Sequence, residues 1–257
     1  RPGVNNIIFQ SVNMVANDSW DQVTGRLVSS YQLDDDQMVF ASYSTGYKSG
    51  GFDSLTPSTQ AFEPEETTNF EIGYKAVLFD SLIANVSAYN LKLKNLQHSI
   101  SSKTPDTLQA VPTIINEDRT IQGIEIDLRW SASDSLLFGL VSEIRQTEIS
   151  SPDFYNGEGT LIEAQKVTND AAANYTITLD WMPELDIGET TLHIDYVFVE
   201  NLNHQQLGLE EYKKGVAAYF IDTKNLNARL SWTSDSENIE VGLWGKNLLD
   251  KQYMYTI

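Results

Sequence analysis

Alternation of apolar and polar residues over long segments is the feature that most constrains this chain. Between Ile124 and Trp130 every second residue is apolar, and the residues between them are Glu125, Asp127 and Arg129. The same alternation recurs over 70–78, 174–181, 192–198, 226–232 and 239–243. A helix would repeat its apolar residues three and four positions apart, so these segments are predicted to be strands with one apolar face.

An all-β fold follows from this pattern, and the connections predict its topology. Short turns rich in Asp, Ser, Pro and Gly alternate with long loops, which is typical of an antiparallel up-and-down meander. The short turns centre near residues 35, 80, 134, 186 and 236, and the long loops cover 49–65, 98–118, 149–170 and 201–217. Ten long strands are expected, over 22–33, 37–48, 66–79, 82–97, 119–132, 136–148, 171–182, 189–200, 218–233 and 238–248.

Strand length and charge favour a membrane barrel over a soluble sandwich. The expected strands have about 11–16 residues, whereas strands of soluble proteins usually have five or six. Short turns at one rim and long loops at the other are typical of outer-membrane barrels, as are strands with one polar and one apolar face. Aromatic residues near the short turns fit an interfacial girdle; they are Tyr31, Phe79, Trp130, Trp181 and Trp232. A sandwich with one solvated face is the alternative.

Composition excludes several other classes of protein. The chain has 36 acidic against 17 basic residues, a formal net charge of −19, so it would repel a phosphate backbone. It contains no cysteine, which excludes disulfides, cysteine-ligated zinc and a thiol nucleophile. Its apolar runs are short, and the start at Arg1-Pro2-Gly3 shows no signal segment, so we expect this start to be internal to a longer chain.

Four motifs, in the same order and spacing, carry a resemblance to a known family. They are Ala41-Ser42-Tyr43-Ser44-Thr45-Gly46-Tyr47-Lys48-Ser49-Gly50-Gly51-Phe52-Asp53; Phe62-Glu63-Pro64-Glu65 followed by Glu71-Ile72-Gly73-Tyr74-Lys75; Asn116 followed by Gly123-Ile124-Glu125; and Asn247-Leu248-Leu249-Asp250-Lys251-Gln252-Tyr253. Together they resemble TonB-dependent outer-membrane receptors, and the resemblance covers nearly the whole chain.

The resemblance implies a 22-stranded transmembrane barrel closed around a plug domain. Residues 1–257 then form part of the C-terminal barrel domain, without the plug and the flanking strands. The implied partners are outer-membrane lipid and lipopolysaccharide, the protein's own plug, the TonB energy-transducing complex acting through that plug, and a small-molecule ligand. The implied location is the outer membrane of a Gram-negative bacterium, and the implied role is transport, with no enzyme activity and no cofactor.

The resemblance implies active uptake of a scarce solute, with a ferric siderophore as the leading solute. Carbohydrate, cobalamin or another metal chelate are alternatives within the family. A passive porin or an adhesin is an alternative from another class, and so is a secreted β-protein that binds glycans. A glycosidase using paired acids such as Glu65-Glu66 or Glu210-Glu211 is the enzyme alternative, although no other catalytic motif supports it.

Aromatic and basic residues of the long loops are the candidate ligand contacts. Such groups suit anionic or catechol-like iron chelates through stacking and cation–π attraction, and aromatic rings suit sugars equally well. The alternative for each residue is that it only orders its own loop. The candidates are Tyr47, Lys48, Phe52, Phe62, Phe154, Tyr155, Tyr212 and Lys213, with Lys214 beside them.

Charged residues on the polar faces of the strands are predicted to form a ladder that lines the lumen and faces the plug. Hydrated charge pairs of this kind contribute only ~0–1 kcal/mol each to stability. The ladder comprises Glu71, Lys75, Glu125, Asp127, Arg129, Arg229 and Lys246.

Histidine spacing predicts no metal site. His98 and His204 are expected at the starts of long loops, as scattered polar residues, and His193 is expected to line the lumen beside Asp195. Asp34-Asp35-Asp36 lacks the spacing of a calcium loop and fits a tight turn.

Overall fold

The computed structural model describes residues 15–53, 61–105, 109–168, 171–200 and 222–252, which form strands without a helix. No helix of this described part is long and apolar enough to cross a membrane. The strands are β1 (Arg26–Gln32), β2 (Gln37–Lys48), β3 (Glu65–Leu78), β4 (Leu82–Ser102), β5 (Val111–Ser133), β6 (Leu136–Ser151), β7 (Phe154–Tyr155), β8 (Leu161–Ile162), β9 (Gln165–Thr168), β10 (Ala172–Trp181), β11 (Glu189–Val199), β12 (Thr223–Thr233) and β13 (Glu240–Gly245).

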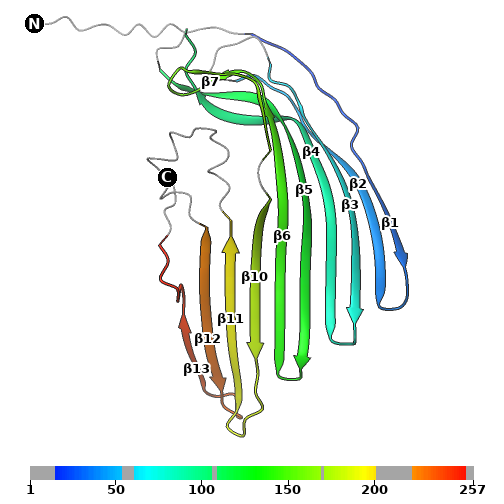
Figure 1. The fold of residues 1–257 in the computed structure, drawn as a ribbon, viewed down its shortest axis with the longest axis vertical. Coiled ribbons are helices and arrows are strands. Elements are labelled where there is room, and N and C mark those ends of the chain that lie inside the picture. The colour runs from blue at the N-terminus through cyan, green and yellow to red at the C-terminus, as the bar shows by residue number, and fades with distance from the viewer. Residues whose placement is uncertain (1–14, 54–60, 106–108, 169–170, 201–221, 253–257) are drawn as a thin grey trace, which may run out of the picture.

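One antiparallel sheet carries most of these strands, and it confirms the predicted meander. The neighbours follow chain order, β1-β2-β3-β4-β5-β6-β10-β11-β12-β13, while β9 pairs with β6 and β7 pairs with β8. Figure 1 shows the sheet as a single curved layer with short turns at one end and longer connections at the other. Within the described residues the sheet is open, because β1 pairs only with β2 and β13 only with β12.

The register sorts the side chains into two faces, as the alternation predicts. Ile72 lies opposite Ala88, which lies opposite Ile124, and this row is apolar. Lys75 lies opposite Asn85, which lies opposite Asp127, and this row is polar. We call these the outer face and the inner face, respectively.

The outer face has no protein core beneath it. In the described residues the buried apolar side chains are Ala76, Ala84 and Ala172 alone. Large outer-face side chains remain open, with Ile72 54% exposed and Leu243 72% exposed. Because no second sheet or helical layer covers these residues in the described part of the chain, the soluble sandwich has no support here.

The predicted loop over 98–118 is wrong for most of its length. β4 continues to Ser102 and β5 begins at Val111, so the two strands extend as a long hairpin. A bulge between Leu93 and Leu96 shifts the register, and Asn95 takes a left-handed φ of 54° there. The bulge reverses the phase of the alternation, which is why period-two reasoning ended the strand at residue 97.

Other element boundaries also need correction. The loop expected over 149–170 contains the end of β6 and the short strands β7, β8 and β9, and the loop expected over 49–65 contains a bridge between Gly51 and Phe62. The first strand begins at Arg26 rather than at residue 22, and the last covers Glu240–Gly245 rather than 238–248. The loop expected over 201–217 lies outside the described residues.

Two glycines of the family motifs, Gly73 and Gly123, lie beneath aromatic rings of neighbouring strands. A Cβ atom added at Gly73 would lie 2.3 Å from the Phe40 ring, and one added at Gly123 would lie 2.6 Å from the Tyr89 ring. Each ring therefore lies across a position that only glycine leaves open, which fixes the register of adjacent strands on the inner face.

We expect Gly123→Ala in the full-length protein to lower the free energy of unfolding by roughly 1–3 kcal/mol, because the added methyl displaces the Tyr89 ring. Thermal unfolding of the detergent-solubilised protein measures the change. Gly242→Ala is the control, since its Cβ would meet only Arg229 Nη2 at 3.9 Å. Equal melting temperatures for the two variants would contradict the interlocking of Tyr89 with Gly123.

Candidate functional site

A hollow of about 560 Å³ on the inner face gathers most of the predicted charge ladder. Its lining includes Glu71, Lys75, Glu125 and Asp127, which come from β3 and β5. The ammonium of Lys75 lies 5.6 Å from the centroid of the Phe40 ring, a cation–π distance. The inner face therefore presents both signs of charge to whatever fills the interior.

Glu143 is the centre of the polar contacts beside this hollow. The Tyr89 hydroxyl donates to Glu143 Oε1 at 2.7 Å, and Arg145 Nη1 lies 3.2 Å from Glu143 Oε2. Glu125 lies directly opposite Glu143 in the register. Like charges in opposite positions repel, so the Tyr89 and Arg145 contacts offset an unfavourable pair.

A second hollow of about 420 Å³ lies on the inner face of β11, β12 and β13. His193 Nδ1 lies 2.6 Å from Asp180 Oδ1, and Asn227 donates to Asp195 Oδ2 at 2.7 Å. The predicted ladder residues Arg229 and Lys246 line this hollow together with Trp244. His193 therefore lies on the inner face, as expected, and faces two carboxylates rather than Asp195 alone.

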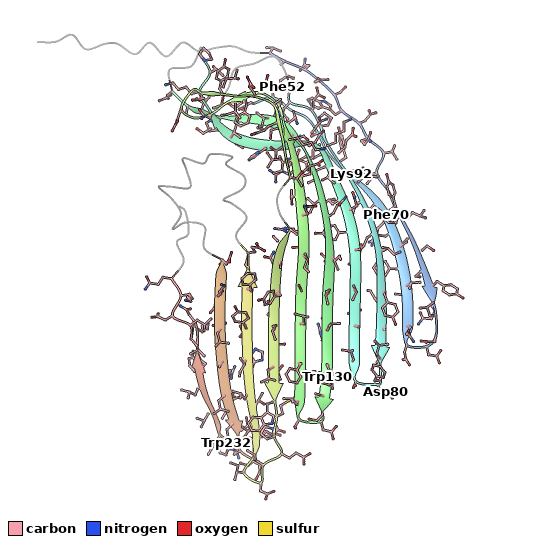
Figure 2. The ribbon with its side chains drawn as sticks, viewed as in Figure 1. Phe52, Phe70, Asp80, Lys92, Trp130 and Trp232 are labelled. Atoms are coloured by element: carbon pink, nitrogen blue, oxygen red, sulfur yellow. The ribbon has the colours of Figure 1, made fainter. Side chains whose placement is uncertain are left out.

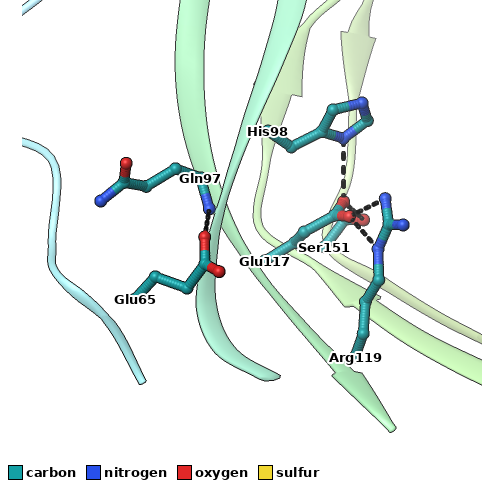
Figure 3. A network of polar contacts seen from close by, with 6 residues as sticks. All are labelled: Glu65, Gln97, His98, Glu117, Arg119 and Ser151. Carbon is teal, nitrogen blue, oxygen red and sulfur yellow. Dashed lines mark hydrogen bonds and ion pairs between the residues drawn. The ribbon is translucent and has the colours of Figure 1, made fainter. Parts of the chain in front are cut away.

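A buried carboxylate joins three strands at the long-loop end of the sheet (Figure 3). The Glu117 side chain is 3% exposed, and its Oε1 accepts from Arg119 Nε at 2.6 Å. Its Oε2 lies 3.2 Å from His98 Nδ1 and 3.4 Å from Ser151 Oγ. The expectation that His98 is a scattered loop residue is wrong, because His98 lies within β4 and contacts this network.

Side-chain amides attach the segment around Glu63 to the extended hairpin. Asn116 Oδ1 accepts from the Glu63 amide at 2.8 Å, and Asn116 Nδ2 donates to the carbonyls of Glu63 and Asn95 at 3.1 and 2.7 Å. Gln97 Nε2 donates to the carbonyl of Ser49 at 2.8 Å. The Phe62-Glu63-Pro64-Glu65 motif and the Asn116 motif therefore meet in space, and the bulge at Asn95 lies between them.

The ligand candidates that the structure describes lie in several segments at the long-loop end of the sheet. Phe52 lies 6.3 Å, ring to ring, from Trp20 of the segment before β1, and Phe62 lies across Gly51 of its own segment. Phe154 and Tyr155 form β7 and pair with β8.

Two neighbouring candidates face opposite sides of the sheet. In the register Tyr47 lies opposite Glu66 and shares the outer face with Phe70, whereas Lys48 lies opposite Glu65 and shares the inner face with Glu71. Tyr212, Lys213, Lys214 and His204 lie outside the described residues. Ligand contact by any of these residues stays a prediction.

Two of the residues that build the rim, Glu117 and Arg119, lie in or beside a segment that was expected to be loop, and their contacts were not predicted. Asn116 was predicted only as part of a family motif, and Tyr89, in the middle of the sheet, carries no charge that would have marked it. In the described residues no group of three or more His, Asp or Glu is arranged to hold a metal ion.

We expect Glu117→Ala to lower the free energy of opening the β4–β5 hairpin by roughly 3 kcal/mol, because it leaves Arg119 without its buried partner. Hydrogen exchange of the full-length protein would show faster exchange in residues 96–119. Glu240→Ala is the matched control, since it breaks an exposed ion pair with Arg229, and we expect little change there. Unchanged protection in the Glu117 variant would contradict the role of the network.

Asn116→Asp is expected to loosen the Glu63 segment. The carboxylate keeps one acceptor but cannot donate to the carbonyls of Glu63 and Asn95, at a cost of about 1–3 kcal/mol. Exchange of the Glu63 amide hydrogen would accelerate accordingly, while Asn238→Asp in an exposed short turn leaves it unchanged. The same rate in both variants would argue that other contacts hold the segment.

Comparison with known proteins agrees with this geometry. A model of the family described as TonB dependent receptor-like, beta-barrel matches residues 6–248. The ferric-pyoverdine 358 receptor of Pseudomonas putida is 27% identical over 99 residues, 38% of this chain and 12% of that receptor. The pesticin receptor of Yersinia pestis is 24% identical over 142 residues, 53% of this chain and 20% of that receptor.

A solved structure shares the fold. The crystal structure of the ferric yersiniabactin uptake receptor FyuA from Yersinia pestis aligns with a TM-score of 0.63 at 16% sequence identity, over 92% of this chain and 34% of that chain. The chain thus spans only a fraction of the length of each of these relatives. The family is one of receptors and transporters rather than enzymes. Its model matches all but the two ends of the sequence, so the chain belongs to the TonB-dependent receptor-like β-barrel family.

Proposed function

We propose that residues 1–257 form part of the barrel wall of an outer-membrane active transporter, a TonB-dependent receptor that binds and imports a scarce solute. The plug domain and the remaining strands lie outside these residues. The leading solute is a ferric siderophore.

The observation that carries the proposal is the chemical difference between the two faces of the sheet, one apolar and one charged. The outer face exposes large apolar side chains with no protein cover in the described residues, and the inner face exposes carboxylates, ammonium and guanidinium groups. Burying the apolar face in acyl chains stabilises it by the hydrophobic effect, while a hydrated interior solvates the charges. A solvated interior surface suits a plug that must move during transport.

Weak ion pairs on the inner face support a movable plug. Arg129 Nε lies 3.6 Å from Asp127 Oδ1, and Arg229 Nη2 lies 3.3 Å from Glu240 Oε1, with at least a third of each side chain exposed. Each such pair contributes about 0–1 kcal/mol, because water competes for both partners. When the TonB complex pulls on the plug, water can replace the contacts between the plug and the inner face, and this replacement costs little free energy.

The choice of solute rests on the relatives. One curated relative is named for ferric pyoverdine, and the neighbouring solved structure is named for ferric yersiniabactin. The alternatives within the family are carbohydrate and cobalamin. A passive porin or an adhesin is the alternative outside active transport.

Uptake of labelled ferric chelates by cells that express the full-length receptor tests the proposal. We expect binding of at least one chelate and its accumulation only while the proton-motive force is intact, since the TonB complex supplies the energy. The control is the same cells treated with a protonophore, in which binding persists and accumulation stops.

The other outcomes are equally distinct. Accumulation that ignores the protonophore would replace active transport by a passive pore. Energy-dependent uptake of labelled cobalamin or an oligosaccharide, with no chelate bound, would keep the transporter and change its solute.

A further inference from the structure

The short hairpin of β7 and β8 lies against the end of β4 at the long-loop end of the sheet. The backbone N–H of Lys103, just after β4, donates to the Asn156 carbonyl at 3.0 Å. A Cβ atom added at Gly157 would lie 3.3 Å from Ser101 Oγ, and one added at Gly159 would lie 3.5 Å from the Lys103 carbonyl oxygen. Figure 1 shows the ends of β4 and β5 bent over at this end, with β7 beside them. The turn of the hairpin therefore docks on the end of β4.

The Asn156 side chain shapes this turn. Its Oδ1 accepts from the backbone N–H groups of Glu158 and Thr160 at 3.0 and 2.9 Å. Its own N–H donates to the Thr160 carbonyl at 3.0 Å, and Gly159 takes a left-handed φ of 86°, which glycine adopts without strain. The surface that the turn presents to β4 therefore depends on one amide side chain.

The hairpin is too short to hold this order by itself. β7 and β8 have two residues each, and their pairs are Phe154 with Ile162 and Tyr155 with Leu161. Even a longer two-stranded hairpin is only marginally stable in water when it is isolated. Leu161 is 48% exposed, so apolar burial adds little to these two pairs. The order of the hairpin therefore depends on its contacts with the end of β4.

The end of β4 is itself braced by its neighbours. Gln97 Nε2 donates to the Ser49 carbonyl at 2.8 Å, which attaches the extended hairpin to the segment after β2. Glu117 Oε2 accepts from Ser151 Oγ at 3.4 Å, and Ser151 is the last residue of β6, shortly before β7. Ser102, the last residue of β4, is only 4% exposed. The β7–β8 hairpin is thus held both where it leaves β6 and where its turn meets β4.

We propose that this docking presents Phe154 and Tyr155 to the solute in a preformed position, with Asn156 as the positioning residue. The inference deepens the proposed function and rests on it, because it concerns how the imported solute is bound. A loop that is already ordered binds more tightly than one that must become ordered on binding, since contacts with the solute no longer have to offset the lost conformational freedom. The rim then binds the solute with the β7–β8 hairpin in the place that it already occupies.

Binding of labelled ferric chelates to cells that express the full-length receptor tests this role, at a temperature that stops uptake. Asn156→Ala should weaken chelate binding about tenfold, because the two aromatic side chains would then become ordered only on binding. Asn238→Ala is the matched control, since it removes an exposed amide from a short turn at the opposite end of the sheet and should leave binding unchanged.

A disulfide across the docked surfaces provides a rescue that a general loss of stability would not show. Residues 1–257 contain no cysteine, and a Cβ atom at Gly157 would lie 3.6 Å from Ser101 Cβ, which suits a disulfide. Oxidised Ser101→Cys/Gly157→Cys receptor should bind the chelate as the wild-type receptor does. When Asn156→Ala is added to this pair, oxidation should restore the tenfold loss and reduction should bring it back.

Weaker chelate binding by the oxidised double-cysteine receptor than by its reduced form would overturn the inference, because the hairpin would then have to leave β4 during binding. Unchanged binding by Asn156→Ala would also overturn it. Failure of the disulfide to form would overturn the docking itself, whatever solute the receptor takes. If the wild-type receptor binds no chelate, the proposed solute is wrong, and formation of the disulfide still tests the docking separately.

Discussion

The continuous antiparallel ladder is the constraint on which the rest of the structure depends. Acyl chains offer no hydrogen bonds, so each backbone N–H and C=O at membrane depth must pair within the protein. Ten strands from β1 to β13 pair in chain order, and in the described residues the two ends of this order, β1 and β13, each have one unpaired edge. The solved relative has the same fold over 92% of this chain, which corresponds to 34% of that relative.

The ladder also determines how the two faces are used. Because side chains alternate along a strand, a fixed register assigns each residue to the outer or the inner face, and a slip of one residue would exchange the two. Phe40 across Gly73 and Tyr89 across Gly123 oppose such a slip on the inner face. At the long-loop end of the sheet, past the bulge, Glu117 and Asn116 join β4, β5, β6 and the Glu63 segment into one rim.

Sequence reasoning succeeded where alternation was unbroken and failed where its phase changed. The ten principal strands, their order and the charged inner face were all predictable, because each strand repeats one local rule. The extended hairpin was not, since the bulge at Asn95 moves the inner positions of β4 from Leu91 and Leu93 to Leu96 and His98. The rim contacts of Asn116 depend on a segment more than 50 residues earlier in the chain, and no local pattern reports such a partner.

The sequence by itself determined the all-β class, the two-faced strands and the family, because these follow from local periodicity and short motifs. Only the tertiary structure decided which residues share a face across strands, that Glu117 is buried against Arg119 and His98, and that Tyr47 and Lys48 face opposite sides of the sheet. These depend on register and on one bulge, and a register is a relation between strands that neither strand's sequence contains alone.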